Sequence, residues 1–160
     1  MYGIHGVCRI LDLEQRKIDR KNIEYYVLEP IDQPGARFYV PTQNEAAVSK
    51  LRPVITQQEL NALLKDGDAC TDVWIEDENQ RKQYYRELIC SGDRERLIRM
   101  VCSLYRHKAA QSTAGRKVHL CDENFLHDAE KLLTGEAAII LNLDMDAART
   151  YLRRKLKEDA

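Results

Sequence analysis

The chain lacks long apolar segments and any stretch dominated by glycine or proline. Its longest uninterrupted apolar run covers only residues 137–141, far below the ~20 residues that a membrane-spanning helix needs. Arg9, Asp12 and Glu14 interrupt the N-terminal region, so no secretory signal peptide is expected there. Seven glycines and four prolines in 160 residues exclude a collagen-like or linker-dominated chain. These absences predict a globular protein located in the cytoplasm.

Paired cysteines are also missing. The five cysteines are widely spaced and form no C-x-x-C pair, so neither a zinc site nor a redox site of that type is expected. Their odd number also argues against a disulfide framework, and apolar neighbours favour reduced, buried thiols. The sequence therefore predicts no metal and no cofactor.

The N-terminal part has the composition of β-strands. Residues 7–13, 23–28 and 37–40 are rich in β-branched and aromatic side chains, which suit a pleated, half-buried surface. We expect a polar connection over residues 14–22 and a reverse turn at Pro34-Gly35. Short strands separated by turns predict a small, strongly bent antiparallel sheet.

From Thr56 onward the apolar period becomes helical. Thr56 and Glu59 have the spacing of a capping box, and we expect further helices over 72–90, after Asp93, from Asp122, and from 144 or 146. The sequence thus predicts an α+β fold. Its predicted parts are a sheet domain at 1–55, a helix and linker at 56–68, and a compact helical bundle at 69–160.

Basic residues are concentrated in the helical part, although the formal net charge of the chain is only −1. Residues 79–119 carry ten basic side chains against three acidic ones. Such a block is typical of contact with a polyanion, and the alternative is a solvated helix face. Guanidinium and ammonium groups suit phosphate oxygens, so the candidate phosphate contacts are Arg81, Lys82, Arg86, Arg96, Arg99 and Arg106. Arg96, Arg99, Ser103 and Arg106 are expected to share one helix face.

Trp74 is the only tryptophan. A single tryptophan in a helical domain is most often a core residue, and the alternative is an exposed ring that wedges between base pairs. The acidic residues 76–78 that follow it disfavour the wedge.

No catalytic motif is present. The four histidines, at positions 5, 107, 119 and 127, fall in separate predicted elements, without an H-E-x-x-H pattern. The sequence also lacks G-x-S-x-G and Walker motifs. We therefore do not expect an enzyme, and a hydrolase or metal enzyme would need convergent His or carboxylate groups.

Several strings occur in an order that resembles one family. Tyr2-Gly-Ile-His-Gly-Val-Cys-Arg-Ile10, Glu14-Gln-Arg-Lys-Ile18, Glu24-Tyr-Tyr-Val-Leu28, Val40-Pro41 and Leu51-Arg-Pro-Val54 resemble the N-terminal module of the CarD family. These are bacterial transcription regulators that bind RNA polymerase. Further on, Ser91-Gly-Asp93, Leu104-Tyr-Arg106 and the segment 129–136 look like the helical domain of the same family.

The resemblance implies a Tudor-like N-terminal domain, shared with transcription-repair coupling factors, that docks on the β subunit of RNA polymerase. Arg16 matches an arginine associated with that contact. A second family arginine falls on Tyr39 here, so aromatic packing is expected in place of an ion pair. Arg16, Arg37 and Tyr39 are the candidate polymerase-binding residues.

The resemblance also implies that the helical domain lies against promoter DNA at the upstream edge of the melted bubble, with a tryptophan wedge in the minor groove. Aligned on Ser91-Gly-Asp93, Trp74 falls a few residues before the family position. The expected function is a non-enzymatic regulator of open-complex stability that binds polymerase and, weakly and without sequence specificity, DNA. The alternative is an adaptor that binds polymerase without DNA contact, and the exposure of Trp74 distinguishes the two.

Overall fold

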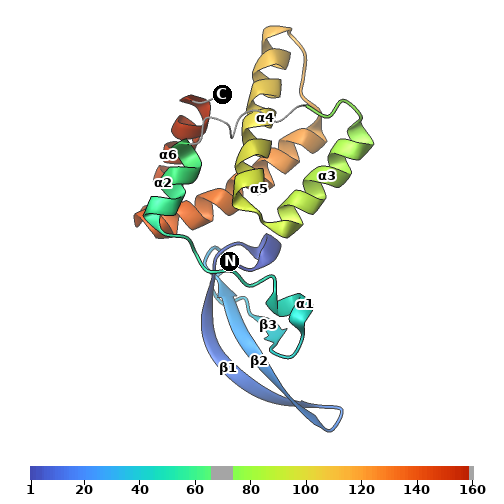
Figure 1. The fold of residues 1–160 in the computed structure, drawn as a ribbon, viewed down its shortest axis with the longest axis vertical. Coiled ribbons are helices and arrows are strands. Elements are labelled where there is room, and N and C mark those ends of the chain that lie inside the picture. Colours follow the sequence, from blue (N-terminus) through green and yellow to red (C-terminus); the bar gives the residue numbers. More distant parts are fainter. Residues whose placement is uncertain (66–73, 159–160) are drawn as a thin grey trace. The chain divides into compact units, whose positions relative to one another are not determined.

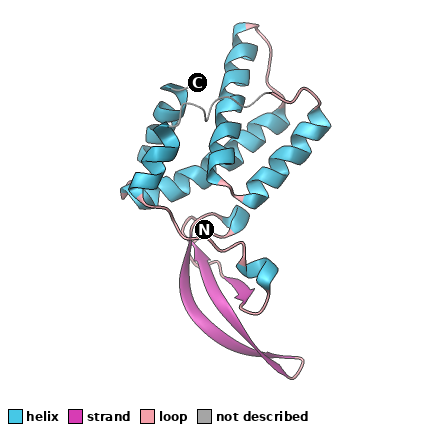
Figure 2. Ribbon diagram, in the orientation of Figure 1, coloured by secondary structure: helices cyan, strands magenta, loops and turns pink. Residues whose placement is uncertain are grey.

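The computed structural model describes residues 1–65 and 74–158, and the chain divides into two compact units (Figures 1 and 2). Met1–Val54 is called the sheet unit and Ile55–Ala160 the helical unit. The three strands lie in the first unit and the long helices in the second (Figure 2). The predicted α+β fold class is confirmed.

The sheet unit is built on three antiparallel strands in the order β1-β2-β3, namely β1 (Cys8–Ile18), β2 (Lys21–Pro30) and β3 (Phe38–Pro41). A short 3-10 helix (Gly3–His5) precedes β1, and α1 (Glu45–Val48) follows β3. The sheet buries Val27, Leu28 and Val40 almost completely, which gives this unit a small core of its own.

β1 and β2 form a long hairpin ribbon that the sequence did not reveal (Figure 1). The prediction of a polar connection over 14–22 is wrong, because both strands continue through it to the pair Ile18 and Lys21. Asp19 and Arg20 form the two-residue turn with φ values of 50° and 65°, the backbone signs of a type I′ turn. β1 is exposed along most of its length, so it carries polar side chains toward the hairpin tip, where no alternating apolar pattern marks the strand.

The described residues of the helical unit form five helices: α2 (Gln57–Lys65), α3 (Glu78–Ser91), α4 (Arg94–Thr113), α5 (Leu120–Leu141) and α6 (Met145–Glu158). None of the helices in the described residues is long and apolar enough to cross a lipid bilayer.

Capping residues mark where α3 ends and where α3 and α4 begin. The break predicted at 91–93 is confirmed: Gly92 ends α3 with φ of 60°, and Asp93 accepts a hydrogen bond from the backbone N–H of Arg96. The predicted helix over 72–90 begins later, at Glu78, because the Asp77 carboxylate caps it by accepting from the N–H of Gln80 at 2.8 Å. Trp74 consequently precedes α3 rather than lying on it, and residues 72 and 73 lie outside the described residues.

α4 is buried on more than one side. Leu97, Ile98, Met100, Val101, Cys102 and Leu104 are almost completely buried in a core shared with α2, α3, α5 and α6. Ser103 is also buried, with 6% of its surface exposed. The expected exposed stripe through Arg96, Arg99, Ser103 and Arg106 is therefore interrupted at Ser103.

The predicted capping box at the start of α2 is confirmed. The N–H of Thr56 donates to Glu59 Oε2 at 2.8 Å, and the N–H of Glu59 donates to Thr56 Oγ1 at 3.2 Å. The hydrogen bonds that the backbone N–H and the hydroxyl of Thr56 donate to the Glu59 carboxylate lower its pKa. α2 buries Leu60 and Leu64 in the core of the helical unit, so the cap supports a helix that carries core contacts.

Replacing Thr56 with alanine is expected to lower the free energy of unfolding of the helical unit by about 1 kcal/mol, because it removes the cap. Urea denaturation followed by circular dichroism measures this loss. The matched control is Gln58→Ala in the same exposed first turn, for which we expect almost no change. Equal stability of the two variants would contradict the role of the cap.

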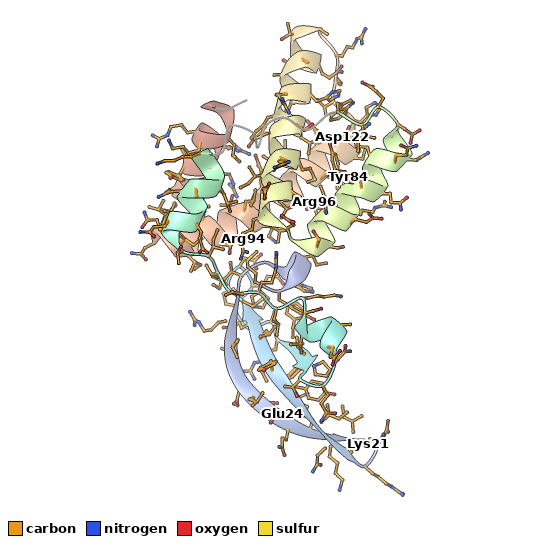
Figure 3. All side chains as sticks on the ribbon, viewed as in Figure 1. Lys21, Glu24, Tyr84, Arg94, Arg96 and Asp122 are labelled. Carbon is orange, nitrogen blue, oxygen red and sulfur yellow. The ribbon has the colours of Figure 1, made fainter. Side chains whose placement is uncertain are left out.

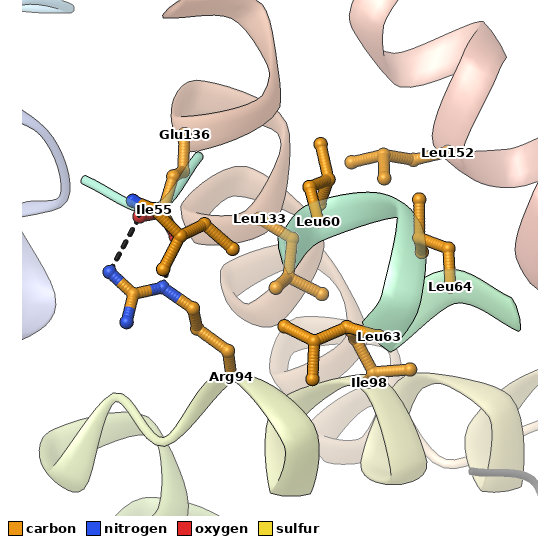
Figure 4. A pocket seen from close by; sticks show the side chains of 9 residues that line it. All are labelled: Ile55, Leu60, Leu63, Leu64, Arg94, Ile98, Leu133, Glu136 and Leu152. Atoms are coloured by element: carbon orange, nitrogen blue, oxygen red, sulfur yellow. Dashed lines mark hydrogen bonds and ion pairs between the residues drawn. The ribbon is translucent and has the colours of Figure 1, made fainter. Parts of the chain in front are cut away.

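The segment predicted as helix and linker, 56–68, is divided by the structure. Its residues 57–65 are α2 and belong to the helical unit, while 66–68 lie outside the described residues. A small cavity beside α2 is lined by apolar side chains and by the ion pair Arg94–Glu136, whose atoms Nη2 and Oε1 are 2.6 Å apart (Figure 4). Glu136 also accepts from the N–H of Ile55 at 3.3 Å, which fixes the start of this unit.

Candidate functional site

Arg16 and Tyr39 lie in contact on one face of the sheet. Arg16 comes from β1 and Tyr39 from β3, and the guanidinium carbon lies 3.7 Å from the centroid of the phenol ring. This distance is within the range of a cation–π contact. Two predicted polymerase-binding residues, which are far apart in the sequence, are thus brought together.

Glu14 and Tyr25 extend this contact. Arg16 donates from Nε and Nη2 to Glu14 Oε2 at 3.1 and 3.0 Å, and Tyr25 packs edge-on against Tyr39 with centroids 6.4 Å apart. The hydrogen bonds to Glu14 raise the pKa of Arg16, so the side chain stays charged. We call Glu14, Arg16, Tyr25 and Tyr39 the aromatic–arginine cluster. It is a partly exposed cluster that contains one cation held by hydrogen bonds and by an aromatic ring.

The outer strand of the sheet offers a second feature beside this cluster. β1 is an edge strand, and its apolar residues Ile10 and Leu13 are 62% and 49% exposed. They lie on the face opposite Arg16, because side chains alternate along a strand, Leu13 is an odd number of residues away, and the register shift between Ile10 and Asp12 puts Ile10 on the same face as Leu13. Arg37, the third predicted residue, is exposed just before β3, outside the contact between Arg16 and Tyr39. An edge strand with exposed apolar side chains is suited to pairing with a strand of another protein.

Arg81 is not part of an exposed basic surface, and its assignment as a phosphate contact is wrong. Its side chain is buried, and Nε and Nη2 donate to Asp122 Oδ1 and Oδ2, both at 3.0 Å. Asp122 of α5 is itself only 1% exposed. Arg81 is therefore a structural residue that joins α3 to α5.

The other predicted cations differ in their surroundings. Lys82 forms an ion pair with Glu78, and Arg99 forms one with Glu95, each within its own helix. Arg86 is exposed on α3, and Arg106 is partly buried. Arg96 is exposed on α4, and its guanidinium lies 5.6 Å from the ring of Tyr84 on α3 (Figure 3).

Additional exposed cations lie near the end of α4 and in the loop that follows it. Arg116 and Lys117 are exposed and line an open hollow together with Lys108, which pairs with Glu123. All three belong to the basic block of residues 79–119. In the structure, exposed cations thus come from α3, from both ends of α4 and from the loop after it.

Trp74 is partly buried and packs against the core of the helical unit. Its ring stacks on His107 of α4 with centroids 3.6 Å apart and planes 4° apart, and the guanidinium of Arg81 lies 4.4 Å from the ring centroid. Sequence reasoning missed His107 and Asp122 as partners, since no spacing rule links residues from separate helices. Trp74 is neither freely exposed nor completely buried.

Among the residues that the structure describes, no group of three or more His, Cys, Asp or Glu side chains is arranged to hold a metal ion.

The sheet unit thus has the characteristics of a protein-interaction module: an edge strand with apolar residues, and a charged aromatic cluster beside it. Residues 1–55 match the family model described as the CarD-like/TRCF RID domain. The sheet unit is a domain of this kind, which confirms the resemblance for this part of the chain and implies an interaction with RNA polymerase. No curated protein matches the chain.

Proposed function

We propose that this protein is a non-enzymatic transcription regulator that binds the β subunit of RNA polymerase and contacts promoter DNA at the upstream edge of the bubble. Contact with distorted duplex shifts the equilibrium between closed and open complexes. The observation that carries the proposal is the match of residues 1–55 to the CarD-like/TRCF RID domain.

The polymerase contact would use the edge of β1 and the aromatic–arginine cluster. A strand of the partner can pair with the open backbone edge, while Ile10 and Leu13 on one face and Arg16 on the other supply specificity. An arginine held in place by Glu14 and Tyr39 loses less conformational entropy on binding than a free one. This pre-organisation favours a role for Arg16 as an anchor of the interface.

The DNA contact would use the exposed cations of α3 and α4. Phosphate contacts position a protein without reading bases, so this surface would recognise the shape of the template. Affinity for free DNA would be low, because a chain of net charge −1 gains little from counterion release unless polymerase holds it close to the promoter.

A direct test measures binding of the full chain to a polymerase β-subunit fragment and to a bubble-containing promoter DNA. We expect a complex with the β fragment, and DNA contact that becomes measurable only when polymerase is present. Absence of β-fragment binding would reject the proposal.

An adaptor that binds polymerase without DNA is the second candidate. It is favoured by the ion pairs of Lys82 and Arg99 with neighbouring acids and by the burial of Arg81, which leave fewer cations for phosphate. Both candidate functions include the polymerase contact, and they differ only in whether the helical unit contacts DNA.

Replacing both Arg86 and Arg96 with glutamate distinguishes them. If the helical unit contacts phosphates, the double variant is expected to weaken promoter contact in the polymerase complex and to reduce the salt dependence by about one per lost phosphate contact. Arg154→Glu, the same charge change on the exposed face of α6, serves as the control and should behave as wild type. DNA contact unchanged in the double variant would favour the adaptor.

A further inference from the structure

The ring of Trp74 is held by two side chains from different helices. The imidazole of His107 on α4 is almost parallel to the indole at 3.6 Å, and the Arg81 guanidinium of α3 lies 4.4 Å from the indole centroid. An almost parallel stack at this distance is a close packing contact, which excludes water from the covered face of each ring.

Arg81 also holds the backbone next to Trp74. Its Nη1 donates to the carbonyl oxygens of Ile75 at 2.7 Å and Glu76 at 3.2 Å, while Asp122 accepts from its other nitrogens. Residues 74–77, here called the Trp74 arm, are thereby tied to the helical unit. Arg81 is fixed by a buried acid, so it provides a rigid anchor, whereas His107 is the partner whose charge can change near neutral pH.

Charged groups from several elements face His107. Asp122 at the start of α5 and Glu76 of the Trp74 arm favour its protonation, whereas Arg81 of α3 and His119 before α5 oppose it. Asp122 already accepts both hydrogen bonds from Arg81, which limits what it can offer a second cation. Burial lowers the pKa of His107 from its usual value, and the positive charge of Arg81 acts in the same direction.

We propose that Arg81 and His107 are positioning residues for Trp74, and that protonation of His107 releases the indole ring from the stack. A charged imidazole recovers its hydration by leaving the covered position and moves away from the Arg81 guanidinium. Attraction between the imidazolium and the indole face opposes release. The proposal concerns the helical unit alone and does not depend on polymerase or DNA binding.

The direction of the pH dependence follows from linkage. Since His107 binds its proton more weakly in the stack than when released, the released state takes up protons at a higher pH. The stack is therefore fully favoured above the usual histidine pKa of about 6.5 and is weakened progressively as the pH falls below that value. Release would expose an aromatic side chain and loosen one end of the Trp74 arm.

Fluorescence of Trp74 tests the proposal directly, because this is the only tryptophan in the chain. In the full-length wild-type protein, lowering the pH from 7.5 to 5.5 should shift the emission maximum to longer wavelength and increase quenching by acrylamide. The variant His107→Phe keeps a stacked ring without a titrating group, so both changes should be lost. The control His127→Gln removes an exposed histidine from α5 and should retain them. The same titration in His107→Phe as in wild type would overturn the proposal.

A second measurement tests the same proposal on the wild-type protein if one of these variants folds poorly. Proton NMR of the wild-type protein should show a His107 ring resonance displaced by the indole ring current, with a titration midpoint below about 6.5. In Trp74→Leu the midpoint should rise and the displacement should vanish, because the covering ring is gone. A His107 midpoint at or above 6.5 in wild type, or one that Trp74→Leu leaves unmoved, would contradict the positioning role.

Discussion

Replacing Asp122 with alanine should lower the free energy of unfolding of the helical unit by about 3–5 kcal/mol, the cost of leaving one charge of a buried ion pair without its partner. Asp122 and Arg81 are 1% and 3% exposed, so water cannot replace the lost carboxylate. The lost pair would also free the guanidinium that binds the carbonyl oxygens of the Trp74 arm. Urea denaturation monitored by circular dichroism provides the measurement.

The control for this variant is Asp128→Ala, which removes an exposed acid from the same helix and should change the stability by less than about 0.5 kcal/mol. A double-mutant cycle built from Arg81→Met, Asp122→Ala and the double variant measures how strongly the two residues contribute jointly to the free energy of unfolding. Because the two residues share one ion pair, we expect the double variant to lose less than the sum of the single losses. A loss below about 1 kcal/mol for Asp122→Ala would mean that the pair contributes little to the helical unit.

Replacing Arg16 with glutamate should weaken binding to the polymerase β fragment by at least about 30-fold, corresponding to about 2 kcal/mol for an anchor residue of an interface. The new carboxylate would lie beside Glu14 and over the face of Tyr39, where the structure now holds a cation. The fold of the sheet unit should be preserved, since the Arg16 side chain is 43% exposed. Isothermal titration calorimetry measures the affinity, and circular dichroism checks the fold.

Lys17→Glu is the matched control for this change. Lys17 is the next residue of β1, carries the same charge, and points to the opposite face of the strand. We expect a clearly smaller loss of affinity for it than for Arg16→Glu. Equal losses would indicate a general effect of charge rather than an anchor at the aromatic–arginine cluster, and unchanged binding by Arg16→Glu would remove Arg16 from the interface.

Local patterns predicted the features that depend on neighbouring residues. The capping box at Thr56 and Glu59 and the cap at Asp93 involve residues three apart, and both are present. The α+β order of the fold also followed from the change in apolar period at Thr56.

Features that depend on contacts between distant residues were not accessible in this way. β1 is exposed along most of its length, so the hydrophobic alternation that marks a strand is absent from its outer part. Arg81 belongs to a basic run in the sequence, and only its pairing with Asp122 of another helix shows that it is structural. Arg16 and Tyr39 were both predicted, but their mutual contact follows from strand pairing across β2.

The position of Trp74 changes what the wedge hypothesis requires. One face of the ring is covered by His107, so insertion between base pairs would first require the stack to open. If the ring stays stacked in the promoter complex, DNA contact would rest on the exposed cations of α3 and α4. The pH dependence of Trp74 fluorescence therefore bears on both possibilities, an indole that can leave the stack to act as a wedge and an indole that stays packed in the helical unit.

The lifetime of the promoter open complex, measured with and without the protein, is the decisive test of a role in open-complex stability. We expect saturating wild-type protein to change this lifetime, Arg16→Glu to have a much smaller effect at the same concentration, and the Arg86→Glu, Arg96→Glu double variant to have a reduced effect. A lifetime that the wild-type protein leaves unchanged, although it is bound to polymerase, would contradict a role in open-complex stability.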